Sequence, residues 1–293
     1  MTKKFIILTL SIGIPCAALG AVAGVMIGQQ HYAPKVDYGA MDIDNLEDDN
    51  DATYEKYKKT DASKYLKEFE SYELVNIAFK KVGEHDCFHT IGKGMVDASG
   101  IKQTIRSNYV KSYDDMFWEN ISASNLVQVA WRFYQTSNTI TTFEGKYKST
   151  ETATYTEDKK TDYVANDFEE NWGKQLTRPS IYIVSSKTTK KGEVKEQDGN
   201  YVVSLDLDPN YSVARYVKQM QRISGLSKPP VFESVHIDFT LDKTLLLKEI
   251  SINEHYTVSM FGTHDSIGTL VETFTYDEEK SIPTYSEDAN YEK

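Results

Sequence analysis

One short segment of the chain carries residues whose types and spacing could bind a metal ion. His85, Cys87 and His89 stand at alternate positions directly after Glu84. In an extended strand, alternate side chains point to the same side, and imidazole and thiolate groups are ligands that zinc prefers. No fourth ligand is evident nearby. We therefore interpret the segment as the start of a strand, with a small core cysteine and solvated histidines, and we predict no cofactor.

The other groups capable of catalysis follow no recognisable pattern. The sequence lacks the Gly-x-Ser-x-Gly, His-Glu-x-x-His, phosphate-loop and dinucleotide-binding motifs. His236 falls in a C-terminal hairpin that we expect to turn at Asp242 and Lys243, in a register that places it opposite Glu249. An exposed pair of this kind is typical of a surface ion pair. We predict that the protein is not an enzyme.

The composition of the 293 residues bounds the kind of protein this is. Hydrophobic residues make up 40% of the chain and aromatic residues 12%, enough for a genuine core, while the net charge is -11. A surface this acidic repels phosphate backbones, so we exclude nucleic acid as a partner. Of the two cysteines, Cys16 lies in an apolar N-terminal run and Cys87 in the main domain. No disulfide is expected within that domain.

The N-terminal segment predicts a membrane anchor. Lys3 and Lys4 precede Phe5–Gly28, which has 24 residues without a charge, and about 20 apolar residues suffice to cross a bilayer. Basic residues on its N-terminal side orient the N-terminus to the cytoplasm and the main domain to the outside of a bacterial-type cell membrane. The alternative is a cleaved signal peptide that is processed at Ala21–Ala23.

Three glycines within this apolar run have a four-residue spacing. Gly20, Gly24 and Gly28 would let two helices approach closely in lipid, which favours self-association or docking on a partner helix. Small residues are also common in signal-like segments, so the spacing has an ordinary explanation as well.

The rest of the chain divides by charge and hydrophobicity into three parts. Residues 29–60 are predicted to be an acidic linker, because Asp37–Glu55 carries eight acids and no base and should remain extended. Residues 61–277 form the main domain, and residues 278–293 are an acidic tail. No internal repeat or linker divides the main domain.

The hydrophobic period within the main domain predicts a mostly β, α+β fold. A period of 3.6 residues predicts helices over Ala62–Lys80, which Asp61 caps, over Phe168–Gln175 and over Pro209–Ile223. A period of two predicts long antiparallel strands. These strands fall between Phe88 and Tyr147, at Ile181–Ser185 and Tyr201–Leu207, and in a last meander of Val231–Leu241, Thr244–Met260 and Ser266–Tyr276, whereas Lys148–Lys160 reads as exposed strand ends and loops.

Two groups of residues indicate binding. The aromatic and apolar side chains of Tyr109, Val129, Trp131 and Phe133 are predicted to line a sheet face under the helices, where an acyl chain could enter. Arg215, Lys218 and Arg222 form a basic stripe on the polar side of the second long helix. This stripe is either a solvated helix face or a site for anionic lipid headgroups.

The order of elements resembles the half-barrel folds of bacterial lipoprotein carriers, the LolA-like superfamily. The helix Ala62–Lys80 and the two meanders Phe88–Tyr147 and Val231–Tyr276 carry this likeness of layout, with no sequence signature behind it. The resemblance implies a curved antiparallel sheet or half-barrel covered by two or three helices, with a lipid or acyl chain between them. We thus predict a membrane-anchored, extracytoplasmic binding protein for a hydrophobic ligand; the alternative is an envelope protein–protein interaction module with a filled core.

Overall fold

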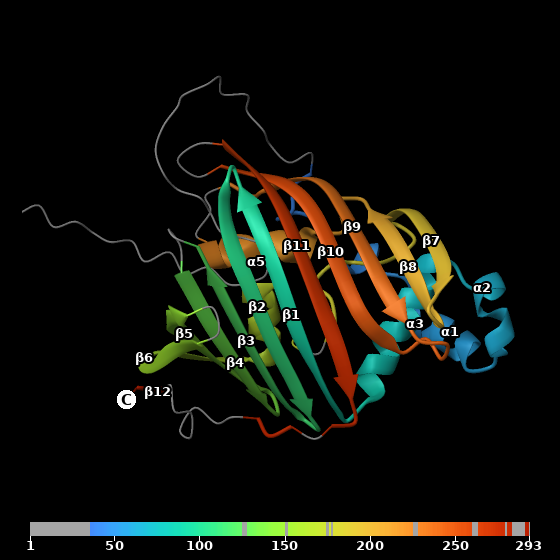
Figure 1. The fold of residues 1–293 in the computed structure, drawn as a ribbon, viewed down its shortest axis with the longest axis horizontal. Helices are drawn as coiled ribbons and strands as arrows, with labels where there is room; N and C mark the ends of the chain where they lie inside the picture. Colours follow the sequence, from blue (N-terminus) through green and yellow to red (C-terminus); the bar gives the residue numbers. More distant parts are fainter. Residues whose placement is uncertain are drawn as a thin grey trace, which may run out of the picture.

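Strands with alternating buried and exposed side chains build a single sheet (Figure 1). The computed structural model describes residues 36–124, 128–149, 152–173, 176, 178–224, 228–259, 263–278, 280–282 and 291–292. Its 12-stranded sheet has the order β12-β6-β5-β4-β3-β2-β1-β11-β10-β9-β8-β7 and does not close on itself. The strands are β1 Cys87–Ala98, β2 Ile101–Ser112, β3 Asp115–Ala123, β4 Gln128–Thr136, β5 Thr139–Ser149, β6 Thr152–Val164, β7 Thr189–Gln197, β8 Asn200–Leu207, β9 Val231–Leu241, β10 Leu247–Ser259, β11 Thr263–Tyr276 and β12 Tyr291–Glu292.

The pairing of β1 with β11 joins two meanders into this sheet. Strands β1–β6 follow one another on one side of the joint, and β7–β11 follow one another on the other. All of these pairs are antiparallel, while the two-residue β12 runs parallel to β6. The prediction of a mostly antiparallel β fold is confirmed.

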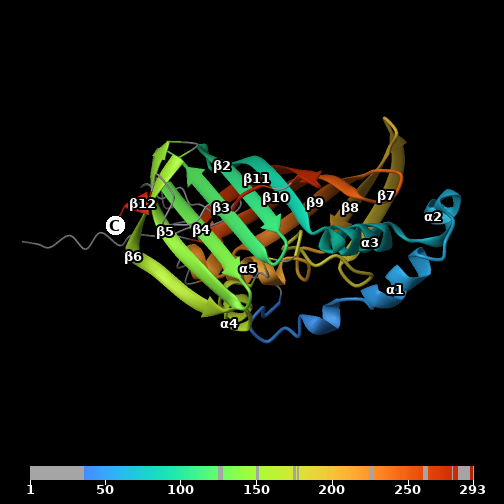
Figure 2. The same cartoon turned by 90° about the horizontal axis from the view of Figure 1, so that it is seen from below.

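Helices cover one face of the sheet (Figure 2). Helix α3 (Ser71–Glu84) packs on β7, β8 and β10, α4 (Ala165–Trp172) packs on β5 and β6, and α5 (Ala214–Ser224) packs on α4. Two shorter helices, α1 (Asn50–Tyr57) and α2 (Tyr65–Glu68), precede α3, and α1 packs against it. In the part of the chain that the structure describes, no helix is long and apolar enough to span a membrane. The predicted anchor 1–28, with Gly20, Gly24 and Gly28, lies outside the described residues.

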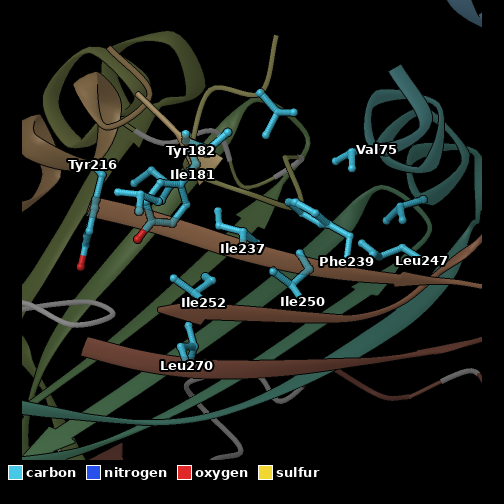
Figure 3. Close-up of a cluster of buried hydrophobic side chains, with 14 of the residues drawn as sticks. Val75, Ile181, Tyr182, Tyr216, Ile237, Phe239, Leu247, Ile250, Ile252 and Leu270 are labelled. Carbon is cyan, nitrogen blue, oxygen red and sulfur yellow. The ribbon is translucent and has the colours of Figure 1, made fainter. Parts of the chain in front are cut away.

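The main core lies between the helices and this covered face (Figure 3). Val75 of α3, Tyr182 of the loop before β7 and Tyr216 of α5 belong to this core together with strand residues such as Ile237, Phe239 and Ile252. Alternation along β2 places Tyr109 on this covered face. A second, smaller core lies on the opposite face, which we call the outer face; its buried members are Val110, Phe117, Ile121, Ala130, Tyr134, Phe143, Ala153 and Tyr155.

The first predicted helix is broken. Phe69 adopts an extended conformation, and a new helix starts behind Glu70, whose N–H donates to Glu73 Oε2 at 2.8 Å in a capping box. The capping box at Glu70 starts a new helix at this point, although the stripe of apolar residues continues across the break. Helix α3 then runs through Gly83 to Glu84 instead of ending at Lys80.

The acidic segment expected to be an extended linker is partly helical, so that prediction is wrong for 44–57. Asp49 caps α1 by accepting from the N–H of Ala52 at 3.0 Å, and Tyr54 of α1 donates to Glu84 of α3 at 2.6 Å. A 3₁₀ helix at Asp44–Leu46 precedes it. The acids do not repel one another into an extended chain, because several have individual donors as partners.

Two further expectations about strands fail for identifiable reasons. The polar run Lys148–Lys160 forms much of strand β6, in which Ala153 and Tyr155 are buried at alternate positions. The segment Ile181–Ser185 is buried but is not a strand, since Ile183 N–H bonds to the carbonyl of Ser212 and not to a neighbouring strand.

The C-terminal hairpin has a different register from the predicted one. Its loop is longer because the Asp242 carboxylate accepts the N–H groups of Thr244 and Leu246 at 2.8 and 2.9 Å. Position 236 therefore lies opposite Asn253 instead of Glu249, and His236 contacts Asp206 at 2.6 Å.

Gly173 tests the packing between α4 and α5. It ends α4 with a φ of 68°, and a Cβ added there would lie 2.4 Å from the backbone oxygen of Arg215. We expect Gly173→Ala to lower the free energy of unfolding by about 2–3 kcal/mol, because left-handed strain adds to a backbone clash. Gly199→Ala is the matched control, with a φ of 78° and open space around the added Cβ. Equal losses for both variants in chemical denaturation would contradict the packing argument.

Candidate binding site

Three of the predicted ligand residues lie on the covered face, and helix α4 packs on two of them, Trp131 and Phe133. Tyr109, Trp131 and Phe133 all belong to the main core, and Phe133 is fully buried. The Phe133 ring lies 5.7 Å from that of Phe168 and 5.2 Å from that of Trp172, both on α4. Val129 pairs with Ser122 in the sheet, and its side chain is outside the described part of the chain. The chain's own aromatic rings thus occupy the face that was expected to receive a ligand.

The space left beside these rings is small. A cavity of about 30 Å³ lies next to Tyr109, lined also by Phe88, Trp118, Leu176 and Phe274. That volume corresponds to one water molecule, so an acyl chain does not fit there. Burial raises the pKa of Tyr109 above its ordinary value, because it disfavours the charged phenolate.

The predicted basic stripe on α5 does not form as expected, because Arg215 is buried. Its Nη1 donates to Glu47 at 2.7 Å, and Arg178 donates to the same carboxylate oxygen at 2.6 Å. Half-burial raises the pKa of Glu47, but the two guanidinium groups outweigh it and leave that pKa below its ordinary value. Lys218 is exposed, whereas the side chain of Arg222 is outside the described part of the chain.

The structure does not bring the three weak metal candidates together. His85 follows α3 and contacts Asp277 at 3.2 Å, Cys87 is a buried free thiol, and His89 accepts from Lys280 at 2.9 Å. Within the described ranges, one group of potential ligands does converge, namely Glu233, His255 and Asp265. It lies at the surface, where close contacts of the His255 ring nitrogens with both carboxylates account for it.

A larger hollow opens on the outer face. It has a volume of about 420 Å³ and lies over β1–β4, next to the C-terminal residues Lys280 and Ser281. Sites for small molecules usually fall between about 300 and 1,000 Å³. Its remaining lining residues are His89, Ile91, Arg106, Ser107, Asn108, Val110, Phe117, Glu119, Ile121 and Arg132.

A buried polar network forms one wall of this hollow. Arg132 Nε donates to Glu119 Oε1 at 2.6 Å, and the Tyr155 hydroxyl donates to the same oxygen at 2.9 Å. The guanidinium carbon of Arg132 lies 4.2 Å from the centre of the Tyr155 ring. Burial, followed by the charge of Glu119, raises the pKa of Tyr155 well above its ordinary value. The network holds Arg132 in one orientation.

Beside the hollow, the outer face carries exposed apolar side chains. Ile91 and Met95 on β1, and Ile267 and Val271 on β11, are 39–56% exposed. Register places them together, since Lys93 pairs with Val271 and Met95 pairs with Thr269. We call these four residues the outer strip. Clusters of large exposed apolar residues on a soluble surface commonly mark contact sites.

Sequence reasoning missed both outer-face features. Alternation along β1 places His89, Ile91, Lys93 and Met95 on one face of the strand, so the sequence did contain a sign that they lie together. It did not reveal which face the helices cover. The sequence alone therefore favours the covered face as the binding face, and the structure does not support that choice.

Comparisons with known proteins add little to this. No protein-family model and no curated protein matches the chain. A crystal structure of a DUF1329 family protein from Desulfovibrio piger is similar at 10% identity over 72% of this chain and 93% of that chain, with a TM-score of 0.24. MucB in complex with MucA(peri) is similar at 8% identity over 70% and 94%, with a TM-score of 0.12. Scores this low carry no argument, so the resemblance to lipoprotein carriers is one of layout: an open antiparallel sheet with helices on one face.

Proposed function

We propose that the protein is a non-enzymatic binding module, anchored in the cell membrane by its N-terminal segment, that binds a partner protein on the outer side. The observation that carries this proposal is the exposed outer strip of Ile91, Met95, Ile267 and Val271. The packing of α4 on Phe133 supports the same choice, because the rings of Phe168 and Trp172 occupy the place where an acyl chain was expected.

The chemistry of the strip specifies the partner. The apolar side chains lie on two adjacent strands, and Lys93 stands exposed between Ile91 and Met95. Arg106 lies directly opposite Lys93 on β2. A complementary protein surface presents apolar anchors with acidic residues beside them.

Site-specific photo-crosslinking in the native membrane tests this proposal. A photoreactive residue at Met95 or Ile267 is expected to give one heterologous cross-linked species, which Val271→Asp weakens roughly tenfold or more because it buries a charge at an apolar contact. Val164, which is 48% exposed but lies on β6, is the matched control and should give no such species. Cross-links to a second copy of the chain, or equal cross-links from Val164, would overturn the proposal.

The lipid-ligand hypothesis makes the opposite prediction for the purified protein. If the covered face held an acyl chain, native mass spectrometry of the chain extracted from its own membrane would show a bound lipid. We expect none, because the cavity of about 30 Å³ beside Tyr109 is too small. A stoichiometric lipid that Val129→Trp displaces would return the function to lipid binding.

A further inference from the structure

A second large cavity lies beside helix α3, which packs on the covered face of the sheet. It has a volume of about 460 Å³, within the usual range for small-molecule sites, and lies between α3, the segment before α1 and the loop before β7. The outer strip is on the opposite face of the sheet, so this cavity is a separate site. We propose that it binds a small organic amine, an ammonium group carried on an apolar body.

The cations in the lining do not favour an anionic ligand, because each has a carboxylate partner. Arg178 and Arg215 both donate to Glu47, at 2.6 and 2.7 Å. Lys80 Nζ donates to Asp51 at 2.5 Å. An anion would have to displace one of these carboxylates before it could bind.

The first turn of α1 offers little to an anion either. A helix N-terminus binds anions through backbone N–H groups that have no partner within the helix. Here the N–H of Asn50 donates to the carbonyl of Asp48 at 2.9 Å, and the N–H of Ala52 donates to the side chain of Asp49 at 3.0 Å. The cavity therefore faces two carboxylates at this end and not free N–H groups.

The carboxylates of Asp48 and Asp49 are the groups that call for a cation. Asp48 accepts the N–H of Ser186 at 2.6 Å and its hydroxyl at 2.7 Å, and Asp49 accepts the N–H of Ala52. All of these donors are uncharged, and neither carboxylate forms an ion pair in the part of the chain that the structure describes. Their positions are fixed while their charges are not neutralised, so an ammonium group gains from both.

Asn76 supplies an acceptor that is independent of these carboxylates. Its side chain lines the cavity and is 6% exposed. The amide Nδ2 donates to the carbonyl of Val184 at 3.1 Å, which leaves Oδ1 as the free end of the amide. That oxygen has no hydrogen-bond partner among the described residues. A buried amide oxygen in this situation is satisfied by a donor such as an ammonium N–H.

The remaining wall of the cavity requires the ligand to have an apolar part. Phe79 and Pro179 are half-buried there, and Ile183 and Val184 are buried. A bare cation would leave these side chains in contact with water. An apolar ring or short chain covers them, and its own removal from water favours binding.

Isothermal titration calorimetry of the full chain in an uncharged maltoside detergent tests the site, with benzylamine as the probe. Benzylamine carries an ammonium group on an aromatic body at neutral pH, and it should bind with one-to-one stoichiometry, more weakly as salt increases. Benzyl alcohol lacks the charge, methylammonium lacks the apolar body and phenylacetate has the opposite charge. Each of these should bind at least roughly tenfold more weakly.

Two variants at helix caps provide the matched comparison. Asp49 caps α1 and lines the cavity, whereas Asp61 caps the short helix Ala62–Lys64 and lies outside the lining. Asparagine caps a helix about as well as aspartate, so both variants remove one charge and keep the cap. Asp49→Asn should weaken benzylamine roughly tenfold, and Asp61→Asn should leave its affinity unchanged.

Gly83→Trp tests the cavity without changing a charge. Gly83 lines the cavity, and a Cβ added there meets no atom within 4 Å, so the indole should fill space and abolish binding while the protein stays folded. No saturable binding of benzylamine, equal binding of benzyl alcohol, equal losses in the two cap variants, or undiminished binding in Gly83→Trp would overturn the proposal. A photoreactive residue at position 83 that cross-links to a protein in the native membrane would assign the ammonium group to a partner's side chain, and would overturn a free ligand.

Discussion

Replacing Phe133 with Ala is expected to lower the free energy of unfolding by about 3–5 kcal/mol. The ring is fully buried and lies 4.8 Å from the ring of Trp118 and 5.2 Å from that of Trp172. Its removal leaves a cavity between β4 and α4 that these large rings cannot collapse to fill. Chemical denaturation of the two proteins measures the difference.

An exposed aromatic residue provides the control for this prediction. Tyr113 lies in the turn between β2 and β3 and is 59% exposed, so Tyr113→Ala should change the unfolding free energy by no more than about 0.5 kcal/mol. A loss below about 1 kcal/mol for Phe133→Ala would show that α4 is not tightly packed on the sheet. The covered face would then have room for a ligand after all.

Replacing Arg132 with Met is expected to cost about 3 kcal/mol, near the lower end of the range for a broken buried ion pair. The side chain of Glu119 is only 16% exposed and would be left without its cation, and the Tyr155 hydroxyl alone cannot compensate for a desolvated charge. Thermal and chemical denaturation should both report this loss.

The double variant Arg132→Met with Glu119→Leu separates charge from packing. It removes both partners, so it should recover much of the stability that Arg132→Met loses. Lys102→Met, on the same outer face but exposed, should be nearly neutral. A single variant as stable as the unmodified protein would show that Glu119 is well solvated, and the wall of the hollow would be less fixed than its geometry implies.

Most strands of the two meanders could be predicted from the sequence, because buried and exposed side chains alternate along them. Val231–Leu241 forms β9 with the predicted bounds. Val217 and Met220 are buried on α5 as their spacing indicated, but this helix starts at Ala214 instead of Pro209, and the buried Val213 lies in the turn before it. Periodicity fails where polar residues form a strand, as in β6, or where a cap such as Glu70 interrupts an apolar stripe.

The surroundings of the candidate site residues were much less predictable, because their contacts are made by residues far away in the sequence. Arg215 looked solvated from its helical spacing, but its partner Glu47 stands 168 positions earlier in the chain. The outer strip depends in the same way on the pairing of β1 with β11, for which no local pattern exists. Sequence alternation identifies two faces of a strand, whereas the covering of one face is a property of the whole fold.

The pairing of β1 with β11 also determines at which stage of folding the outer strip forms. Met95 and Thr269 meet there although 174 positions separate them, and strand pairing over such separations is slow because of the entropy lost in closing the loop. Ile91 and Met95 stand on one side of the joint, and Ile267 and Val271 stand on the other. Until β1 and β11 have paired, the outer strip therefore exists only as two separate halves, one on each strand.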